Sequence, residues 1–121
     1  MRKFKDLEVW NLGFNVMIEV YEISKALPKE EKYGLGDQIR RASVAIPSNI
    51  AEGCSRSSDK EFKRYLEIAM GSAFELETQV LAIGRLKLVN HNFEPFFENL
   101  NTLQKKLNAL ITSIKNRIPQ K

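Results

Sequence analysis

Residues 93–117 read FEPFFENLNTLQKKLNALITSIKNR, and this stretch decides the fold. Its apolar residues recur at alternating spacings of three and four: Phe93, Phe96, Leu100, Leu103, Leu107, Leu110 and Ile114. This is the a/d pattern of a helix that packs along one seam. Pro95 falls in the first turn, where its missing N–H costs little, and Lys115 and Arg117 suit the negative end of the helix dipole. We therefore expect a helix over residues 93–117.

Three further segments show helical periodicity, at about residues 6–27, 34–53 and 59–86. Asp6 is a candidate N-cap for the first, and Gly53 is a plausible C-terminal breaker for the second. Ser58 and Glu61 match a capping box ahead of the third. No alternating pattern predicts a strand, and short connectors force neighbouring helices to be antiparallel. The sequence therefore predicts an all-α fold, an up-down-up-down four-helix bundle that forms one domain over residues 1–121.

The first helix is apolar on two opposite sides, which one small core cannot bury together. One stripe consists of Leu7, Trp10, Phe14, Met17 and Tyr21, and the other of Val9, Leu12, Val16, Val20, Ile23 and Leu27. The third helix also carries apolar residues beside its main stripe. Excess apolar surface usually marks an interface with another protein. The alternative is that a broad core within the single bundle buries these residues. We expect self-association through Val9, Val16, Val20, Ile23, Met70, Phe74 and Leu81.

The second helix contains the stretch QIRRASVAIPSNIAEG, residues 38–53. Its apolar stripe keeps the same phase on both sides of Pro47, so we predict one helix with a kink at that residue. Its many alanines and serines would let another backbone approach closely. Helix packing is therefore the simplest interpretation of this stretch.

The same stretch, together with YLEIAMGSAFELETQ at residues 65–79 and FKDLEVW at residues 4–10, resembles the 23S rRNA intervening-sequence proteins. These are small bacterial four-helix bundles, related to the accessory variability proteins of diversity-generating retroelements. The resemblance runs from Phe4 to Leu86, and the fourth helix matches only in its heptad character. It implies a ring-like homopentamer without enzymatic activity. It also implies a role with RNA, DNA or nucleoprotein machinery.

No constellation of residues predicts catalysis, a metal site or a cofactor. His91 lies in a polar turn without an accompanying Glu-x-x-His motif, and Cys54 is the only cysteine. A single cysteine excludes an internal disulfide and is typical of a reducing cytoplasm. No run of apolar residues is long enough to span a membrane. We expect a cytoplasmic protein with no catalytic residues.

Basic side chains are the remaining candidates for function, because the chain has a formal net charge of +4. The expected phosphate contacts are Arg40, Arg41, Lys60, Lys63, Arg64, Lys105 and Lys106. The alternative interpretation is that these residues form an ordinary solvated face, since acidic residues lie among them. We expect a homo-oligomer that binds structured RNA or DNA, or a nucleoprotein, through repeated basic surfaces. A protein-interaction scaffold that binds no nucleic acid is the second hypothesis.

Overall fold

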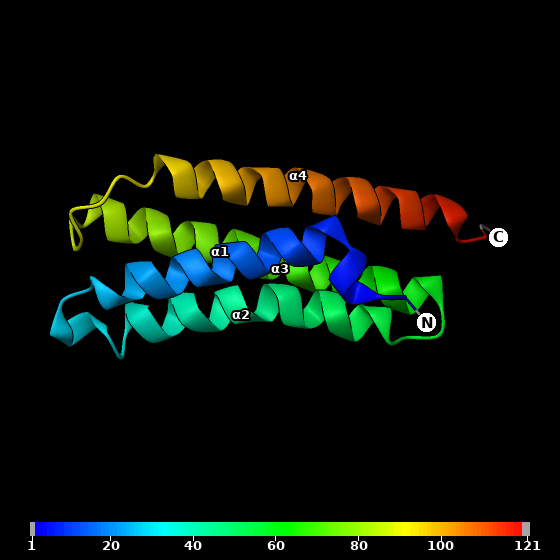
Figure 1. The fold of residues 1–121 in the computed structure, drawn as a ribbon, viewed down its shortest axis with the longest axis horizontal. Helices are drawn as coiled ribbons and strands as arrows, with labels where there is room; N and C mark the ends of the chain where they lie inside the picture. The colour runs from blue at the N-terminus through cyan, green and yellow to red at the C-terminus, as the bar shows by residue number, and fades with distance from the viewer. Residues whose placement is uncertain (1, 120–121) are drawn as a thin grey trace.

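The computed structural model describes residues 2–119, which fold into four antiparallel helices (Figure 1). They are α1 (Glu8–Lys25), α2 (Leu35–Cys54), α3 (Asp59–Arg85) and α4 (Glu94–Arg117). Two short 3-10 helices precede α1 and α2, at Phe4–Asp6 and Lys29–Glu31. The described residues contain no strand. The predicted four-helix bundle is confirmed.

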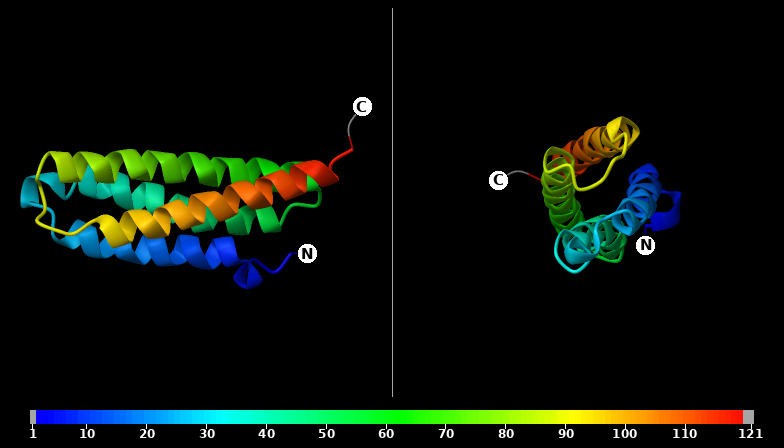
Figure 2. Two further views of the ribbon diagram at one scale, coloured as in Figure 1. Left: turned by 90° about the horizontal axis from the view of Figure 1, so that it is seen from above. Right: turned by 90° about the vertical axis from the view of Figure 1, so that its left-hand side faces the viewer.

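The helices pack in chain order around one core. Neighbouring helices α1 and α2, α2 and α3, and α3 and α4 pack together, and α4 closes the bundle against α1. Therefore α1 and α3 lie across the diagonal of the bundle, as the end-on view in Figure 2 shows. Both chain ends and the α2–α3 connection lie at the same end.

The seam predicted for α4 faces the core. Phe96, Leu100, Leu103, Leu107 and Ile114 are each at most 1% exposed, while Phe93 and Leu110 are half-buried at its edge. Burial of such side chains contributes roughly 1.5–3 kcal/mol each. The predicted cap of α3 is also confirmed, because the Glu61 amide donates to Ser58 Oγ at 3.1 Å.

The structure reverses the two faces predicted for α1. The residues expected at an interface, Val9, Val16, Val20 and Ile23, are at most 4% exposed and lie in the core of the single chain. Phe14 and Tyr21 on the opposite stripe are 38% and 41% exposed. Periodicity identifies two faces but not which one is buried. Here the valine and isoleucine face is fully buried, while the aromatic stripe is half-buried or exposed.

Two smaller expectations about helix ends are also wrong. Asp6 does not cap α1, because it lies in the preceding 3-10 helix and the N-cap residue is Leu7. Gly53 does not break α2, which continues to Cys54, and no glycine among the described residues has a positive φ. α2 passes through Pro47 as one helix; a kink there stays a prediction.

Gly53 is needed for close packing rather than for backbone freedom. A Cβ at this position would lie 2.8 Å from Tyr65 Cβ and 3.1 Å from Phe62 Cδ1 on α3. Neither of these atoms is the far end of a flexible chain. The absence of a side chain at residue 53 therefore sets how closely α2 and α3 approach beside their connection.

We expect Gly53→Ala to lower the free energy of unfolding by about 1–2 kcal/mol, because overpacking outweighs the gain in helix propensity. Gly71→Ala is the matched control, since a Cβ there has no neighbour within 4 Å. It should raise the free energy of unfolding by about 0.5–1 kcal/mol. Urea denaturation of both variants measures the difference, and equal stabilities would contradict the packing role of Gly53.

Candidate nucleic-acid interface

The positive charge of the protein is concentrated at one end of the bundle. We call this the basic end and define it as residues 2–6, 52–64 and 115–119, which the topology brings together. These segments carry nine basic and four acidic side chains, a net charge of +5, whereas the whole chain has a net charge of +4. The rest of the molecule is therefore close to neutral. Such asymmetry directs an anionic partner toward one end.

The acidic residues of the basic end do not neutralise it. Asp59 accepts from two arginines, with Arg2 Nη2 at 2.6 Å and Arg117 Nη2 at 3.3 Å from the same oxygen. Glu52 pairs with Arg56 at 3.2 Å. These contacts hold arginines in place but leave the positive charge in excess. The basic side chains of this end that form no ion pair with a described residue are Lys3, Lys5, Lys60, Arg64 and Lys115.

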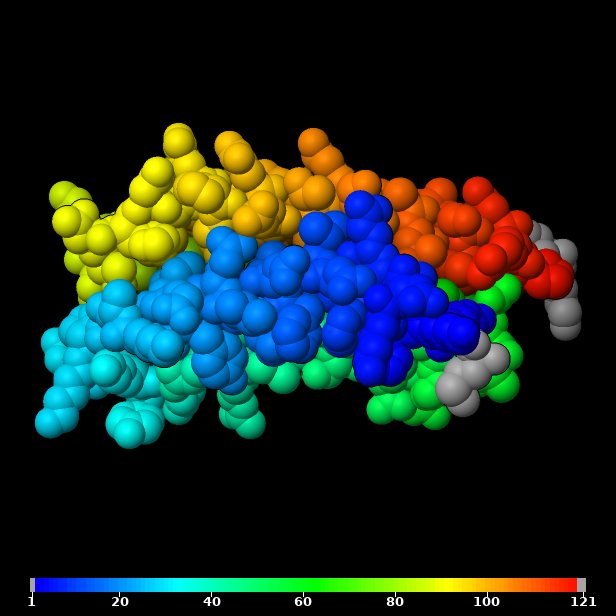
Figure 3. Space-filling view, in the orientation of Figure 1, coloured from blue at the N-terminus to red at the C-terminus, as the bar shows by residue number. Residues whose placement is uncertain are grey.

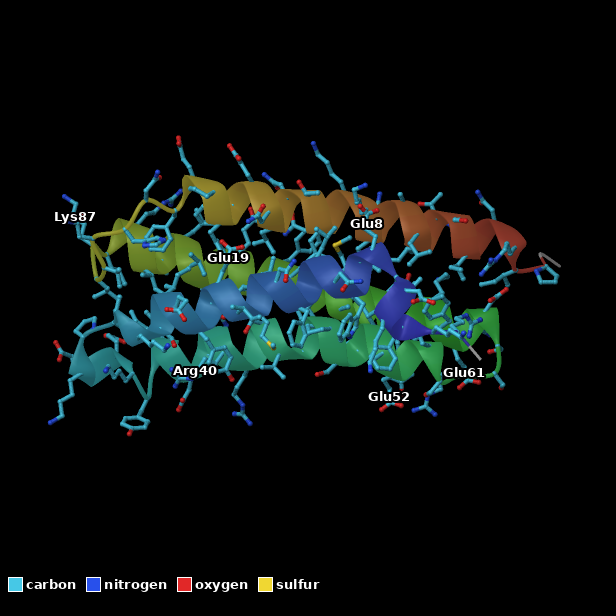
Figure 4. The ribbon with its side chains drawn as sticks, viewed as in Figure 1. Glu8, Glu19, Arg40, Glu52, Glu61 and Lys87 are labelled. Carbon is cyan, nitrogen blue, oxygen red and sulfur yellow. The ribbon has the colours of Figure 1, made fainter. Side chains whose placement is uncertain are left out.

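The structure separates the seven basic residues predicted to touch phosphate. Lys60, Lys63 and Arg64 lie at the basic end, in the first turns of α3. Arg40 and Arg41 lie about 20 Å away along α2, since thirteen residues at 1.5 Å each separate Arg41 from Cys54. Figure 4 places Arg40 well away from Glu52 and Glu61. Lys105 and Lys106 lie midway along α4, so the seven do not form one surface.

Three of the seven already have partners within the chain. Arg40 pairs with Asp37 and donates to the Lys32 carbonyl, Lys63 pairs with Glu67, and Lys106 pairs with Glu8 on α1. Arg41, Lys60, Arg64 and Lys105 are exposed and pair with no described residue. An incoming phosphate would not have to break an ion pair to reach these four side chains.

Sequence pattern alone does not single out Arg2 and Arg56, which join Arg117 around Asp59 at the basic end. These residues are up to 115 positions apart in the chain. One signal could have identified them. In an up-down-up-down bundle the start of the first helix, the second connection and the end of the fourth helix meet at one end, and each of these three places carries an arginine.

Cys54 is a buried residue of the basic end. It is 1% exposed, and burial raises the pKa of its thiol, although the charge of Arg2 lowers that pKa in part. The reactive thiolate is therefore disfavoured at neutral pH. No group of histidine, cysteine and acidic side chains among residues 2–119 is arranged to hold a metal ion. None of the described helices has both the length and the apolar character needed to cross a bilayer.

Apolar side chains form two exposed patches away from the basic end. Phe14, Ile18 and Tyr21 make the α1 patch, and they are 38%, 49% and 41% exposed. Phe74 and Leu81 make the α3 patch with half-buried Met70. The surface view in Figure 3 shows α1 and the N-terminal segment spread across one face, with α4 beside them. Of the predicted residues on α3, Phe74 and Leu81 are exposed and Met70 is half-buried, whereas those on α1 lie in the core.

Comparison with known proteins identifies the family. The sequence model described as 23S rRNA-intervening sequence protein matches residues 5–109, which is most of the chain. The chain belongs to the 23S rRNA-intervening sequence protein family. The match extends through most of α4, beyond the residues whose motifs suggested the resemblance.

A solved structure shares the fold of this family member. It is a protein of unknown function from the S23 ribosomal protein family of Bacteroides thetaiotaomicron, with a TM-score of 0.77 and 24% sequence identity. The alignment covers 86% of this chain and 95% of that one. A search of curated proteins found no match.

Proposed function

We propose that this intervening-sequence protein is a non-enzymatic homo-oligomer that binds structured RNA or DNA, alone or in a nucleoprotein, through its basic end. The observation that carries the proposal is the charge asymmetry, because a net charge of +5 lies in three segments at one end. Lysine and arginine side chains at such an end release counterions when they neutralise phosphates. That release favours binding without reading the base sequence.

The side chains at the basic end favour contact with phosphates rather than with bases. The aromatic residues there are Phe4 and Phe62, with Tyr65 next to them just outside the defined ranges, and none of the three is exposed. Phe62 and Tyr65 lie under the guanidinium groups of Arg2 and Arg56. Stacking of unpaired bases needs exposed rings. The proposed partner is therefore recognised by its backbone charge.

Self-association would multiply this surface. In a rotationally symmetric ring whose bundles run along the symmetry axis, the same end of every protomer lies on the same side, so the basic ends would face a partner together. Such repetition raises the overall affinity by about 10²–10⁴ when several sites engage one nucleic acid. A single bundle with its modest charge would bind more weakly.

The two apolar patches support a head-to-tail ring. The α1 patch and the α3 patch are different surfaces on diagonally opposed helices. A two-fold dimer would pair one patch with itself and leave the other in water. Contact between the α1 patch of one protomer and the α3 patch of the next would cover both. The number of five protomers rests on the resemblance to the family.

The salt dependence of binding tests the charged end. We expect the affinity for duplex DNA to fall with salt at a log–log slope of about −0.9 for each phosphate contacted. The double variant Lys60→Gln with Arg64→Gln should reduce the magnitude of that slope by about 2, because two phosphate contacts are lost. Fluorescence anisotropy across a salt series, on structured RNA and on duplex DNA, measures both quantities.

The matched control is Arg41→Gln with Lys105→Gln, which removes the same charge from exposed, unpaired residues on the sides of the bundle. It should leave the slope almost unchanged. Equal effects of the two double variants would contradict a localised basic end. No binding at ~50 mM salt would refute the nucleic-acid proposal and favour a protein-interaction scaffold.

Complementation tests the ring. We expect Ile18→Lys and Phe74→Lys each to dissociate the oligomer into folded monomers of 13.9 kDa, because both side chains are exposed in the single chain. An equimolar mixture should form a heterodimer, since one intact α1 patch then meets one intact α3 patch. Sedimentation velocity measures the masses, with Asn108→Lys on the polar face of α4 as the control. A monomeric wild type, or a mixture that stays monomeric, would contradict this arrangement.

A further inference from the structure

An open hollow of about 740 Å³ lies at the basic end and is lined mainly by arginine and serine. Its lining residues are Arg2, Ser55, Arg56, Ser57, Asp59 and Arg117. Three separate segments of the chain supply the three guanidinium groups. Like charges gathered in one hollow repel each other, and an anionic ligand relieves that repulsion.

Aromatic rings hold two of the arginines in place. The guanidinium of Arg2 lies 4.2 Å from the centroid of the Phe62 ring, and Arg2 Nη1 donates to the Arg56 carbonyl at 2.9 Å. The guanidinium of Arg56 lies 4.9 Å from the Tyr65 ring, and its Nη2 donates to the Tyr65 hydroxyl at 2.8 Å. Stacked in this way, a guanidinium keeps its N–H edge available to a ligand. Because these groups are already ordered, a ligand costs little conformational entropy.

Most of the N–H donors of these three arginines have no acceptor among the described residues. Three guanidinium groups carry roughly fifteen N–H donors, and the described residues accept five hydrogen bonds from them. Arg56 Nε is buried and has no hydrogen-bond partner within residues 2–119. The hydroxyl of Ser57 also has no partner among the described residues. Forked donors of this kind match the oxygens of a phosphate group.

The charge of the site favours a phosphate that carries two negative charges. The lining has three positive groups and one negative group, and Glu52 pairs with Arg56 from outside the lining. The basic end around it keeps a net charge of +5. A phosphate monoester carries about −1.5 to −2 near neutral pH, because its second pKa is about 6. A backbone diester carries a single negative charge, so the field of this end attracts it less.

We propose that this hollow binds a phosphate monoester dianion. Such a group is present at the phosphorylated end of a nucleic-acid strand, and also in small phosphorylated molecules. Only the assignment to a strand end rests on the proposed nucleic-acid function. In that case the protein holds a strand terminus in the hollow while the surrounding lysines contact backbone phosphates.

Two small probes test the site without any nucleic acid. We expect methyl phosphate to bind at pH 8 at least about tenfold more tightly than dimethyl phosphate, as measured by isothermal titration calorimetry. Its affinity should fall as the pH is lowered through about 6, where the dianion takes up one proton and becomes a monoanion. Equal affinity for the two probes, or no binding of methyl phosphate, would overturn the proposal.

Arg117→Gln tests the location of the site. The Arg117 side chain is 55% exposed, so its loss should leave the fold intact, which circular dichroism checks. We expect the affinity for methyl phosphate to fall about tenfold. Arg117→Lys should restore only part of it, because lysine keeps the charge but loses the fork. Lys115→Gln is the control, since it removes the same charge at this end without lining the hollow. Equal losses in Arg117→Gln and Lys115→Gln would overturn the assignment to the hollow.

Matched oligonucleotides identify the source of the phosphate. One sequence is prepared with a 5′-phosphate, a 3′-phosphate or hydroxyls at both ends. Tighter binding of a phosphorylated end, lost in Arg117→Gln, supports capture of a strand terminus. Binding of methyl phosphate without any preference among the oligonucleotides overturns the strand-end assignment and supports a small phosphorylated ligand. Methyl phosphate binding without binding of any oligonucleotide refutes the proposed nucleic-acid function and leaves the phosphate site standing.

Discussion

At Gly53, α2 and α3 approach each other so closely that a side chain on residue 53 would not fit. Tyr65 Cβ and the ring of Phe62 lie against the position that this side chain would take. The rings of both residues lie under the guanidinium groups of Arg2 and Arg56. One packing contact thus closes the helical hairpin and also orders the arginines at its end. A wider hairpin would keep the four helices but would lose the support beneath the charged groups.

Sequence periodicity determines most of the fold because it reports which positions share a helix face. The α4 seam is buried as its spacing predicts, and Ser58 caps α3 as its motif predicts. Periodicity does not report which of two apolar faces meets the core. On α1, which packs between α2 and α4, the valine and isoleucine face is buried, whereas Phe14 and Tyr21 on the other face are exposed.

The candidate site was only partly predictable for a related reason. Lys60, Lys63 and Arg64 are close in sequence, so a local pattern can identify them. The grouping of Arg2, Arg56 and Arg117 depends instead on the topology of the bundle, which brings the N-terminal segment, the α2–α3 connection and the end of α4 to one end. Arg40 shows the opposite case, because its sequence context suggests a phosphate contact while the structure pairs it with Asp37. The local sequence identifies basic residues that are candidates for phosphate contacts. The fold then determines which of these residues form ion pairs within the chain and which do not.

Charge and apolar surface occupy different parts of the molecule, which allows assembly and binding to act together. The apolar patches lie along the sides on α1 and α3, and the excess positive charge lies at one end. Assembly through the sides would leave the ends uncovered and align them. A large polyanion could then engage several protomers without displacing the contacts between them.

Hydrogen–deuterium exchange with and without a saturating structured RNA would show directly whether nucleic acid contacts the basic end. Amides near helix termini exchange readily, so protection there is measurable. We expect slower exchange in residues 2–6, 52–64 and 115–119, with little change around Arg41 and Lys105. Protection centred on the middle of α2 and α4, with the basic end unchanged, would contradict this expectation.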